Sequence, residues 1–156
     1  MKVYILEYWH WDDYSTHGGF TEEAMNQKRI EFAKKQKEDN IPAIESMRKI
    51  IAEKDEKRKE LIKQAEIEIL PNQKLAKENG NKQLEKDFKK IRKSLLKQAD
   101  TLNWEQKKIQ REINELEEMN ERQLADYFMS KNHLYFYDYD LTENVLEGDW
   151  EWKSMC

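Results

Sequence analysis

The chain has 156 residues, of which 38% are charged and 38% are hydrophobic, and its formal net charge is −4. A compact single-core domain of this length usually has more apolar and fewer charged side chains, so the composition argues against a conventional enzyme domain and favours an elongated protein. No stretch approaches 18 consecutive apolar residues, which excludes a membrane-spanning helix.

The first 20 residues predict two strands. Residues 3–9 are rich in β-branched and aromatic side chains, which is typical of a β-strand, and residues 16–20 could form a short strand that returns beside it. Because side chains alternate along a strand, Tyr4, Leu6 and Tyr8 should share one face. Val3, Ile5 and Trp9 should share the other.

The same region gives no sign of a targeting peptide. It contains Glu7, Asp12 and Asp13 and lacks a small-residue cleavage site. The single cysteine, Cys156, rules out an intramolecular disulfide and a cysteine-based zinc site. We therefore expect a cytoplasmic protein with a free thiol.

Residues 21–131 predict long helices. Of these 111 residues, 61 are Ala, Glu, Lys, Leu or Arg, a composition typical of coiled coils. Thr21 is a suitable N-cap, and the acidic residues that follow it favour a helix start. A seven-residue repeat of apolar side chains then indicates a coiled-coil stripe: Phe88, Leu95, Leu102, Ile109 and Leu116.

The first half of this region has a comparable stripe with a polar interruption. Its apolar members are Ile44, Met47, Ile51, Leu61, Ala65 and Ile69. Lys54 and Arg58 fall in the middle of the series, so we expect its centre to be weakly packed or exposed.

Prolines and an Asn-Gly-Asn sequence predict where the helices end. Pro42 should break or kink the first helix, and Pro71 together with residues 79–81 should mark a turn. Two arms of similar length result, 21–70 and 82–130, joined by a turn at 71–81. This arrangement favours an antiparallel helical hairpin, a coiled-coil stalk, with a bundle folded at Pro42 as the alternative.

The C-terminal segment predicts further strands. Residues 133–139 have the composition of a strand, and residues 145–152 are a candidate fourth strand. A helical hairpin would return the chain to its start, so the two ends can pair. The predicted fold is therefore α+β and mostly helical, with a small antiparallel sheet formed by a head of residues 1–20 and 131–156.

Aromatic and acidic residues gather at the two ends of the chain. Of 17 aromatic residues, 14 lie in 1–20 and 127–152, and the segments outside 21–131 carry two basic against nine acidic side chains. Tyrosine and tryptophan are enriched at protein interfaces, which predicts a partner-binding surface or a homodimer interface. Burial beneath the helix base and the C-terminal segment is the alternative. The candidate residues are Tyr8, Trp9, Trp11, Asp12, Asp13, Tyr14, Tyr137, Tyr139, Trp150 and Trp152.

Short motifs at both ends resemble a family of small bacterial and phage proteins with no assigned activity. The matching segments are Lys2-Val3-Tyr4-Ile5-Leu6, Asp12-Asp13-Tyr14, Gly18-Gly19-Phe20-Thr21-Glu22-Glu23-Ala24 and Tyr139-Asp140-Leu141. The resemblance covers about 40 residues. It implies a strand-helix-strand core into which about 110 helical residues are inserted, and a phage or mobile-element context. It supplies no catalytic residues.

All three histidines lie in the predicted head. His10, His17 and His133, together with Asp138, could bind a zinc or manganese ion and support metal-dependent hydrolysis. The spacing matches no known ligand motif, so a polar surface loop is the alternative. No nucleophile elbow and no phosphate-binding glycine loop occurs. We therefore identify no catalytic residue and expect no cofactor.

Residues 82–111 are strongly basic, with ten basic against four acidic side chains. Five lysines at helical spacing lie along one face and could contact the phosphates of a nucleic acid: Lys82, Lys86, Lys89, Lys93 and Lys97. A solvated face, or one paired with an acidic helix, explains the same pattern.

These patterns favour a non-enzymatic protein-interaction protein that binds and blocks a partner through its head or stalk. The resemblance adds that it could inhibit a host defence or nucleic-acid-processing protein. Nucleic-acid binding and metal-dependent hydrolysis are the alternatives, and no membrane partner is expected.

Overall fold

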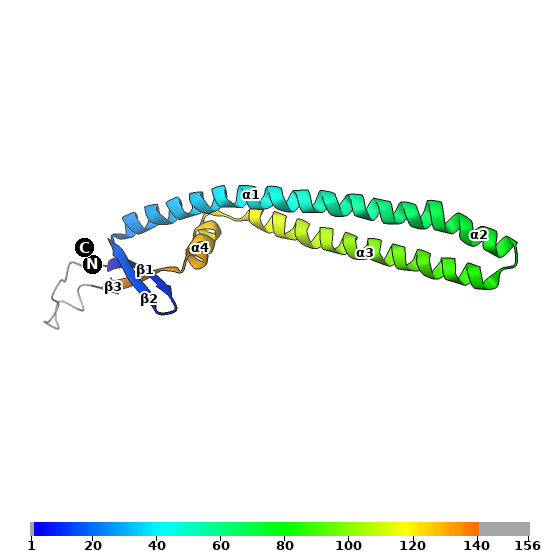
Figure 1. The fold of residues 1–156 in the computed structure, drawn as a ribbon. Coiled ribbons are helices and arrows are strands. Elements are labelled where there is room, and N and C mark those ends of the chain that lie inside the picture. Colours follow the sequence, from blue (N-terminus) through cyan, green and yellow to red (C-terminus); the bar gives the residue numbers. More distant parts are fainter. Residues whose placement is uncertain (1, 141–156) are drawn as a thin grey trace. The chain divides into compact units, whose positions relative to one another are not determined.

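The computed structural model describes residues 2–140, which belong to two compact units. We call the unit formed by residues up to 40 and from 119 onward the head, and the unit Ile41–Glu118 the hairpin. The elements are β1 (Lys2–His10), β2 (Asp13–Phe20), α1 (Glu22–Lys63), η1 (Gln64–Ile69), α2 (Leu70–Glu78), α3 (Lys82–Glu118), α4 (Glu121–Lys131) and β3 (Leu134–Asp140) (Figure 1). The predicted mostly helical α+β class is confirmed.

The head contains a three-stranded antiparallel sheet built from both ends of the described chain. The strand order is β2-β1-β3, so β1 is central and pairs with both neighbours (Figure 1). The predicted second strand is longer than expected, since it begins at Asp13 rather than at residue 16. The candidate strand at 145–152 lies outside the described residues.

One face of the sheet packs against helices and forms the core of the head. Leu6 of β1, Phe32 of α1 and Met129 of α4 are buried together. Aromatic rings extend this cluster: Phe32 stacks on Phe128 at 5.0 Å between centroids, and Phe20 meets Phe136 edge-on at 5.9 Å. Burying each large apolar side chain stabilises the fold by about 2 kcal/mol.

Side-chain caps fix the helix starts in the head. The hydroxyl of Thr21 accepts a hydrogen bond from the amide of Ala24 at 3.2 Å, which confirms the predicted N-cap of α1. At the start of α4, Asn120 and Gln123 form a reciprocal capping box, with both hydrogen bonds 2.9 Å long. This cap separates α4 from α3, where the sequence predicts one continuous arm.

The head therefore includes more of the chain than the predicted 1–20 and 131–156. Segments 21–40 and 119–130 belong to it as well. The physical reason is packing, because Ala33 of α1 is buried with Leu124 and Ala125 of α4 in a second cluster.

The hairpin has a continuous heptad seam on each arm. On α3, positions a and d are all buried or half-buried: Glu85, Phe88, Arg92, Leu95, Ala99, Leu102, Gln106, Ile109, Ile113 and Leu116. On α1, the matching positions are Ile44, Met47, Ile51, Lys54, Arg58, Leu61 and Ala65. The predicted apolar series of α3 is thus one half of a seam whose other half is partly polar.

Polar contacts between the arms occupy the centre of the seam. Lys54 pairs with Glu105 at 2.5 Å, and the side-chain amide of Gln106 donates to the carbonyl oxygen of Ile51 at 3.1 Å. The Lys54 and Glu105 side chains are only 27% and 37% exposed. The centre is therefore closed by polar contacts rather than left exposed.

A π-helical turn, η1, corrects the heptad phase near the end of the first arm. After Ala65, the inward-facing residues are Ile69, Gln73 and Ala76, one position later than an uninterrupted heptad would place them. A π-turn contains one residue more than an α-turn, so η1 absorbs this extra residue and keeps the seam facing α3.

Neither proline ends a helix, so the break predicted as one outcome at Pro42 and the turn predicted to begin at Pro71 do not occur. Helix α1 continues through Pro42, and the carbonyl that loses its donor belongs to the exposed residue Glu38, where water can replace the missing bond. Pro71 lies in the first turn of α2, directly after η1. The turn between the arms is confined to residues 79–81, where Gly80 has a φ of 72°.

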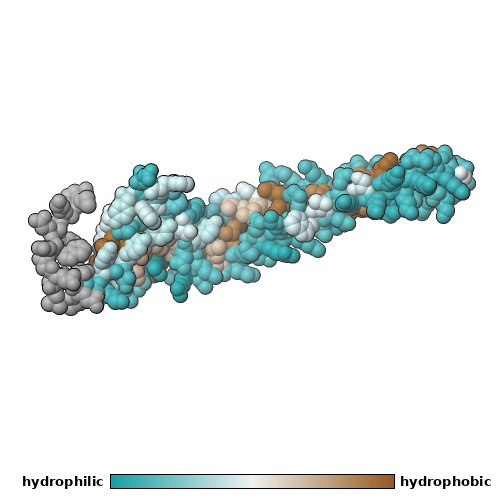
Figure 2. Space-filling view, turned by 90° about the horizontal axis from the view of Figure 1, so that it is seen from below, coloured by the Kyte–Doolittle hydropathy of each residue, from teal (hydrophilic) through white to brown (hydrophobic). Residues whose placement is uncertain are grey.

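The surface of the hairpin is largely hydrophilic on the face shown in Figure 2, with small separate hydrophobic patches. In the part of the chain that the structure describes, no helix combines the length and the apolar character needed to cross a membrane.

Candidate protein-binding surface

The face of the sheet opposite the core carries aromatic side chains in a regular array. Strand pairing places Val3, Ile5, Glu7 and Trp9 of β1 beside Tyr139, Tyr137 and Tyr135 of β3, and beside Thr16 and Tyr14 of β2. We call this set the outer face. Directly opposed residues of antiparallel strands project to the same side, so the three tyrosines of β3 form one row.

The aromatic residues of the outer face are well exposed. Trp9 is 59% exposed, Tyr14 58%, and the three tyrosines of β3 between 38% and 44%. Large aromatic side chains in globular proteins are usually more deeply buried than this. A contiguous group of them on one sheet face is therefore a candidate binding surface.

A hydrogen-bond network fixes the middle of the outer face. The hydroxyl of Tyr14 donates to the Glu7 carboxylate at 2.5 Å, and Thr16 donates to the Tyr14 hydroxyl at 3.5 Å. The bond to Glu7 raises the pKa of Tyr14, because ionisation would remove the donated proton beside a negative charge. This network orients the Tyr14 ring next to Trp9.

Glycines on β2 leave the aliphatic part of the outer face uncovered on that side. Gly19 pairs with Ile5, and a Cβ atom at Gly19 would lie 3.2 Å from a methyl carbon of Val3. Gly18 has a φ of 105°, a conformation that favours glycine, and it lies at the irregular pairing between Ile5 and Glu7. Val3 and Ile5 therefore lie beside a strand segment that has no side chain.

The β1–β2 turn and the start of β2 add a further exposed aromatic ring and two carboxylates. Trp11 has a φ of 54° and is 87% exposed, and its ring meets His10 edge-on at 6.1 Å. Asp12 is exposed in the same turn, and Asp13, the first residue of β2, is exposed directly after it. The turn therefore extends the aromatic and acidic character of the outer face.

The predicted partner-binding residues divide between the two faces. Trp9, Tyr14, Tyr137 and Tyr139 lie on the outer face, whereas Tyr8 lies on the core side with Leu6, as the alternation predicts. Sequence reasoning did not select Tyr135, although its spacing from Tyr137 gives the signal. Trp150 and Trp152 lie outside the described residues.

The histidine cluster predicted as a metal site is only partly assembled. The rings of His10 and His133 lie 4.3 Å apart, but His17 pairs with Ser15 at 3.1 Å and Asp138 with Lys2 at 3.6 Å. Within residues 2–140, His, Cys, Asp and Glu side chains form no group of three or more arranged to hold a metal ion. The geometry thus brings together two of the four predicted ligands.

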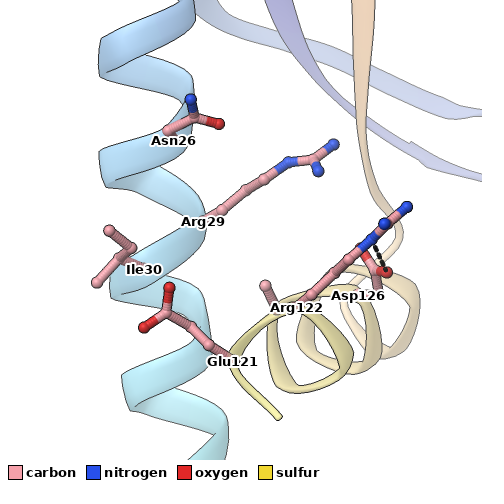
Figure 3. A pocket seen from close by; sticks show the side chains of 7 residues that line it. Asn26, Arg29, Ile30, Glu121, Arg122 and Asp126 are labelled. Atoms are coloured by element: carbon pink, nitrogen blue, oxygen red, sulfur yellow. Dashed lines mark ion pairs between the residues drawn. The ribbon is translucent and has the colours of Figure 1, made fainter.

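A pocket of about 250 Å³, lined in part by charged side chains, lies between α1 and α4 in the head (Figure 3). Arg122 pairs with Asp126 at 4.0 Å, and the guanidinium of Arg29 lies 5.6 Å from the Phe136 ring centroid. Each cation is thus held by a neighbour within the head, and the pocket contains no nucleophile or catalytic dyad. We assign it no chemistry.

The five lysines predicted to contact phosphates are all exposed on the hairpin. Lys82, Lys86, Lys89, Lys93 and Lys97 are on α3, outside the seam. Pairing with an acidic helix of the same chain is not observed, since none of these lysines forms an ion pair within residues 2–140.

In comparisons with protein-family models, curated proteins and solved structures, nothing matches this chain. The resemblance to small bacterial and phage proteins therefore stays a prediction. The functional argument that follows rests on the geometry of the two units.

Proposed function

We propose that this protein is a non-enzymatic binding protein whose head docks onto a basic surface of another protein through its outer face. The observation that carries the proposal is the exposed row of Tyr135, Tyr137 and Tyr139 beside Trp9 and Tyr14. Tyrosine and tryptophan provide large contact areas at low entropic cost. Their hydroxyl and indole N–H groups can also form hydrogen bonds with water at the edge of an interface.

Charge supports a basic partner. Residues 2–20 and 132–140 carry one lysine against five acidic residues. Glu7 lies within the outer face, Asp12 lies in the β1–β2 turn, and Asp13 begins β2 directly after it. Guanidinium and ammonium groups can pair with these carboxylates and also lie over the aromatic rings.

Two further expectations from the sequence are part of this proposal. A cytoplasmic setting is our expectation, as is a role as a phage or mobile-element inhibitor that blocks a host protein. A homodimer is the other candidate for the outer face, and light scattering of the purified protein distinguishes it, because a dimer would double the mass.

The test immobilises the natural chain, a double variant of the outer face and a control variant of the hairpin, and each is used to capture proteins from cell lysate. The captured protein is then purified, and its affinity for each of the three is measured. We expect a stoichiometric, basic partner that binds the natural chain and is lost with Trp9→Ala combined with Tyr137→Ala. The matched control, Ile67→Ala combined with Leu75→Ala on the hairpin, should retain it, because both side chains are well exposed but distant in sequence from the sheet.

The expected loss is at least 30-fold in affinity, since truncating central aromatic anchors costs roughly 2 kcal/mol or more. Absence of any partner, or equal retention by both variants, would contradict the proposal. Circular dichroism of the double variant should show an unchanged fold, because both side chains project away from the core.

A further inference from the structure

The outward-facing side of α3 carries a continuous row of cations. Positions b and f of its heptads point away from the seam. Lys86 and Lys93 occupy successive b positions, and Lys90 and Lys97 occupy successive f positions. All four are exposed, and they follow one helix face over about three turns.

These cations form no ion pair, as is the case for most exposed lysines of the described residues, and what sets them apart is their alignment on one helix face. Lys54 pairs with Glu105 and Lys59 with Asp55, and Lys131 pairs with Asp39. Among the described residues, none of Lys86, Lys90, Lys93 and Lys97 forms an ion pair. The row is therefore a concentration of exposed positive charge on a helix that the seam holds in place.

An exposed tryptophan continues the same column. Trp104 follows Lys90 and Lys97 at the next f position, and Arg111 occupies the one after it. Trp104 is 62% exposed, and Lys108 lies 5.9 Å from its ring centroid. The seam does not need this ring, because an f position points away from the other arm.

From these features we infer that the b and f face of α3 binds single-stranded nucleic acid, with the lysines on phosphates and Trp104 stacked on a base. Lysine binds phosphate as a point charge without reading sequence. An aromatic ring in line with such a row is the second feature that single-strand-binding surfaces use. Two acidic residues share this face: Asp100 lies between the lysines and Trp104, and Glu118 lies at the end of α3.

The tryptophan is what favours a single strand over other polyanions. A duplex keeps its bases stacked on each other, and a lipid headgroup has no planar face, so neither uses a stacking platform. The inference concerns the hairpin alone and is independent of the function proposed for the head.

The test measures fluorescence anisotropy of labelled oligo(dT) and oligo(rU), each of about 20 nucleotides, with the full chain. A duplex of the same length and phosphatidylserine vesicles are the comparison probes. We expect single strands to bind more tightly than the duplex. With about five phosphate contacts, the slope of log affinity against log salt should be about −3.5.

Two variants and one matched control resolve the contributions. Lys90→Glu with Lys97→Glu should reduce the salt slope by about 1.4, because two phosphate contacts are lost. Trp104→Ala should weaken single-strand binding by about tenfold and leave the salt slope unchanged. The control, Lys49→Glu with Lys63→Glu, makes the same charge change at exposed f positions of α1 and should change affinity less than twofold.

Several results would overturn the inference. These are no single-strand binding at about 50 mM salt, equal losses in the α3 variant and the α1 control, tighter binding to duplex or to vesicles than to single strands, or Trp104→Ala without effect. Far-ultraviolet circular dichroism should show that all variants keep the helical content of the natural chain, since every substituted side chain is outside the seam.

Discussion

The head and the hairpin bury apolar surface in different ways. The head uses few but large side chains, with Leu6, Phe32 and Met129 enclosed by aromatic rings on one sheet face. The hairpin buries a small apolar area at each of many positions along a seam that also includes Arg92, Gln106 and Lys54. The head therefore has aromatic residues beyond the needs of its core, whereas the outer surface of the hairpin is mostly charge. The exposed aromatic residues of the head favour the protein partner that we propose for it, and the exposed charge of the hairpin favours the nucleic acid that we propose for α3.

The largest expected effect is in the head core. Phe32→Ala should lower the stability of the head by about 3–5 kcal/mol, because it removes a buried ring that stacks on Phe128. Urea denaturation followed by near-ultraviolet circular dichroism measures the head, and the far-ultraviolet signal measures mainly the hairpin.

The exposed substitution Tyr137→Ala is the control for Phe32→Ala and should change stability by less than about 1 kcal/mol. If Phe32→Ala shifted both signals to the same urea concentration, the two units would unfold together and the comparison between them would fail.

A smaller change in stability is expected when polar residues of the seam are replaced by apolar ones. Lys54→Leu with Glu105→Leu should stabilise the hairpin by about 1 kcal/mol, since a partly buried ion pair often contributes less than apolar packing. Lys54→Leu alone should destabilise it, because Glu105 then loses its partner. Thermal unfolding at constant pH measures both, and destabilisation by the double variant would show that the ion pair is a net stabilising contact.

A helix cap should matter by a similar or slightly smaller amount. Asn120→Ala removes the acceptor for the Gln123 amide and should cost the head about 1 kcal/mol. Asn120→Ser keeps a capping oxygen and should recover most of the loss. Near-ultraviolet denaturation curves of the two variants test this, and equal stabilities would argue against the cap.

The smallest effect concerns Tyr14 on the outer face. Its hydrogen bond to Glu7 raises the pKa of Tyr14, so the neutral phenol is favoured in the folded state. The associated stabilisation is present below the ordinary tyrosine pKa of about 10 and is lost as pH rises through the higher folded pKa. Absorbance titration of tyrosinate in Glu7→Gln should show this tyrosine ionising at lower pH than in the natural chain. An unchanged titration would contradict the role of Glu7.

Much of the secondary structure could be predicted because it depends on periodicity. The series from Phe88 to Leu116 identified α3, and the alternation from Val3 to Trp9 assigned both sheet faces correctly. The prolines misled because their local penalty is small at these two sites: water can reach the carbonyl left by Pro42, and Pro71 lies in the first turn of α2. At Pro42 and Pro71, packing along the arm outweighs it.

The outer face was harder to predict than the elements that form it. Composition indicated an aromatic surface but could not separate Tyr8 from Trp9 by role, since that depends on which side α1 and α4 cover. The partner of Lys54 was equally hidden, because Glu105 is 51 residues away and meets it only across the folded hairpin.

The π-turn η1 has a consequence for how the length of the hairpin can vary. A segment that contains one residue beyond the heptad repeat, between Ala65 and Ile69, keeps both flanking stretches of the seam in phase. Single-residue insertions and deletions are therefore tolerated best at this point, whereas elsewhere on the arms they would rotate every following side chain by about 100°. Chains related to this one should therefore differ in length here by one residue, while the turn at residues 79–81 stays directly before α3.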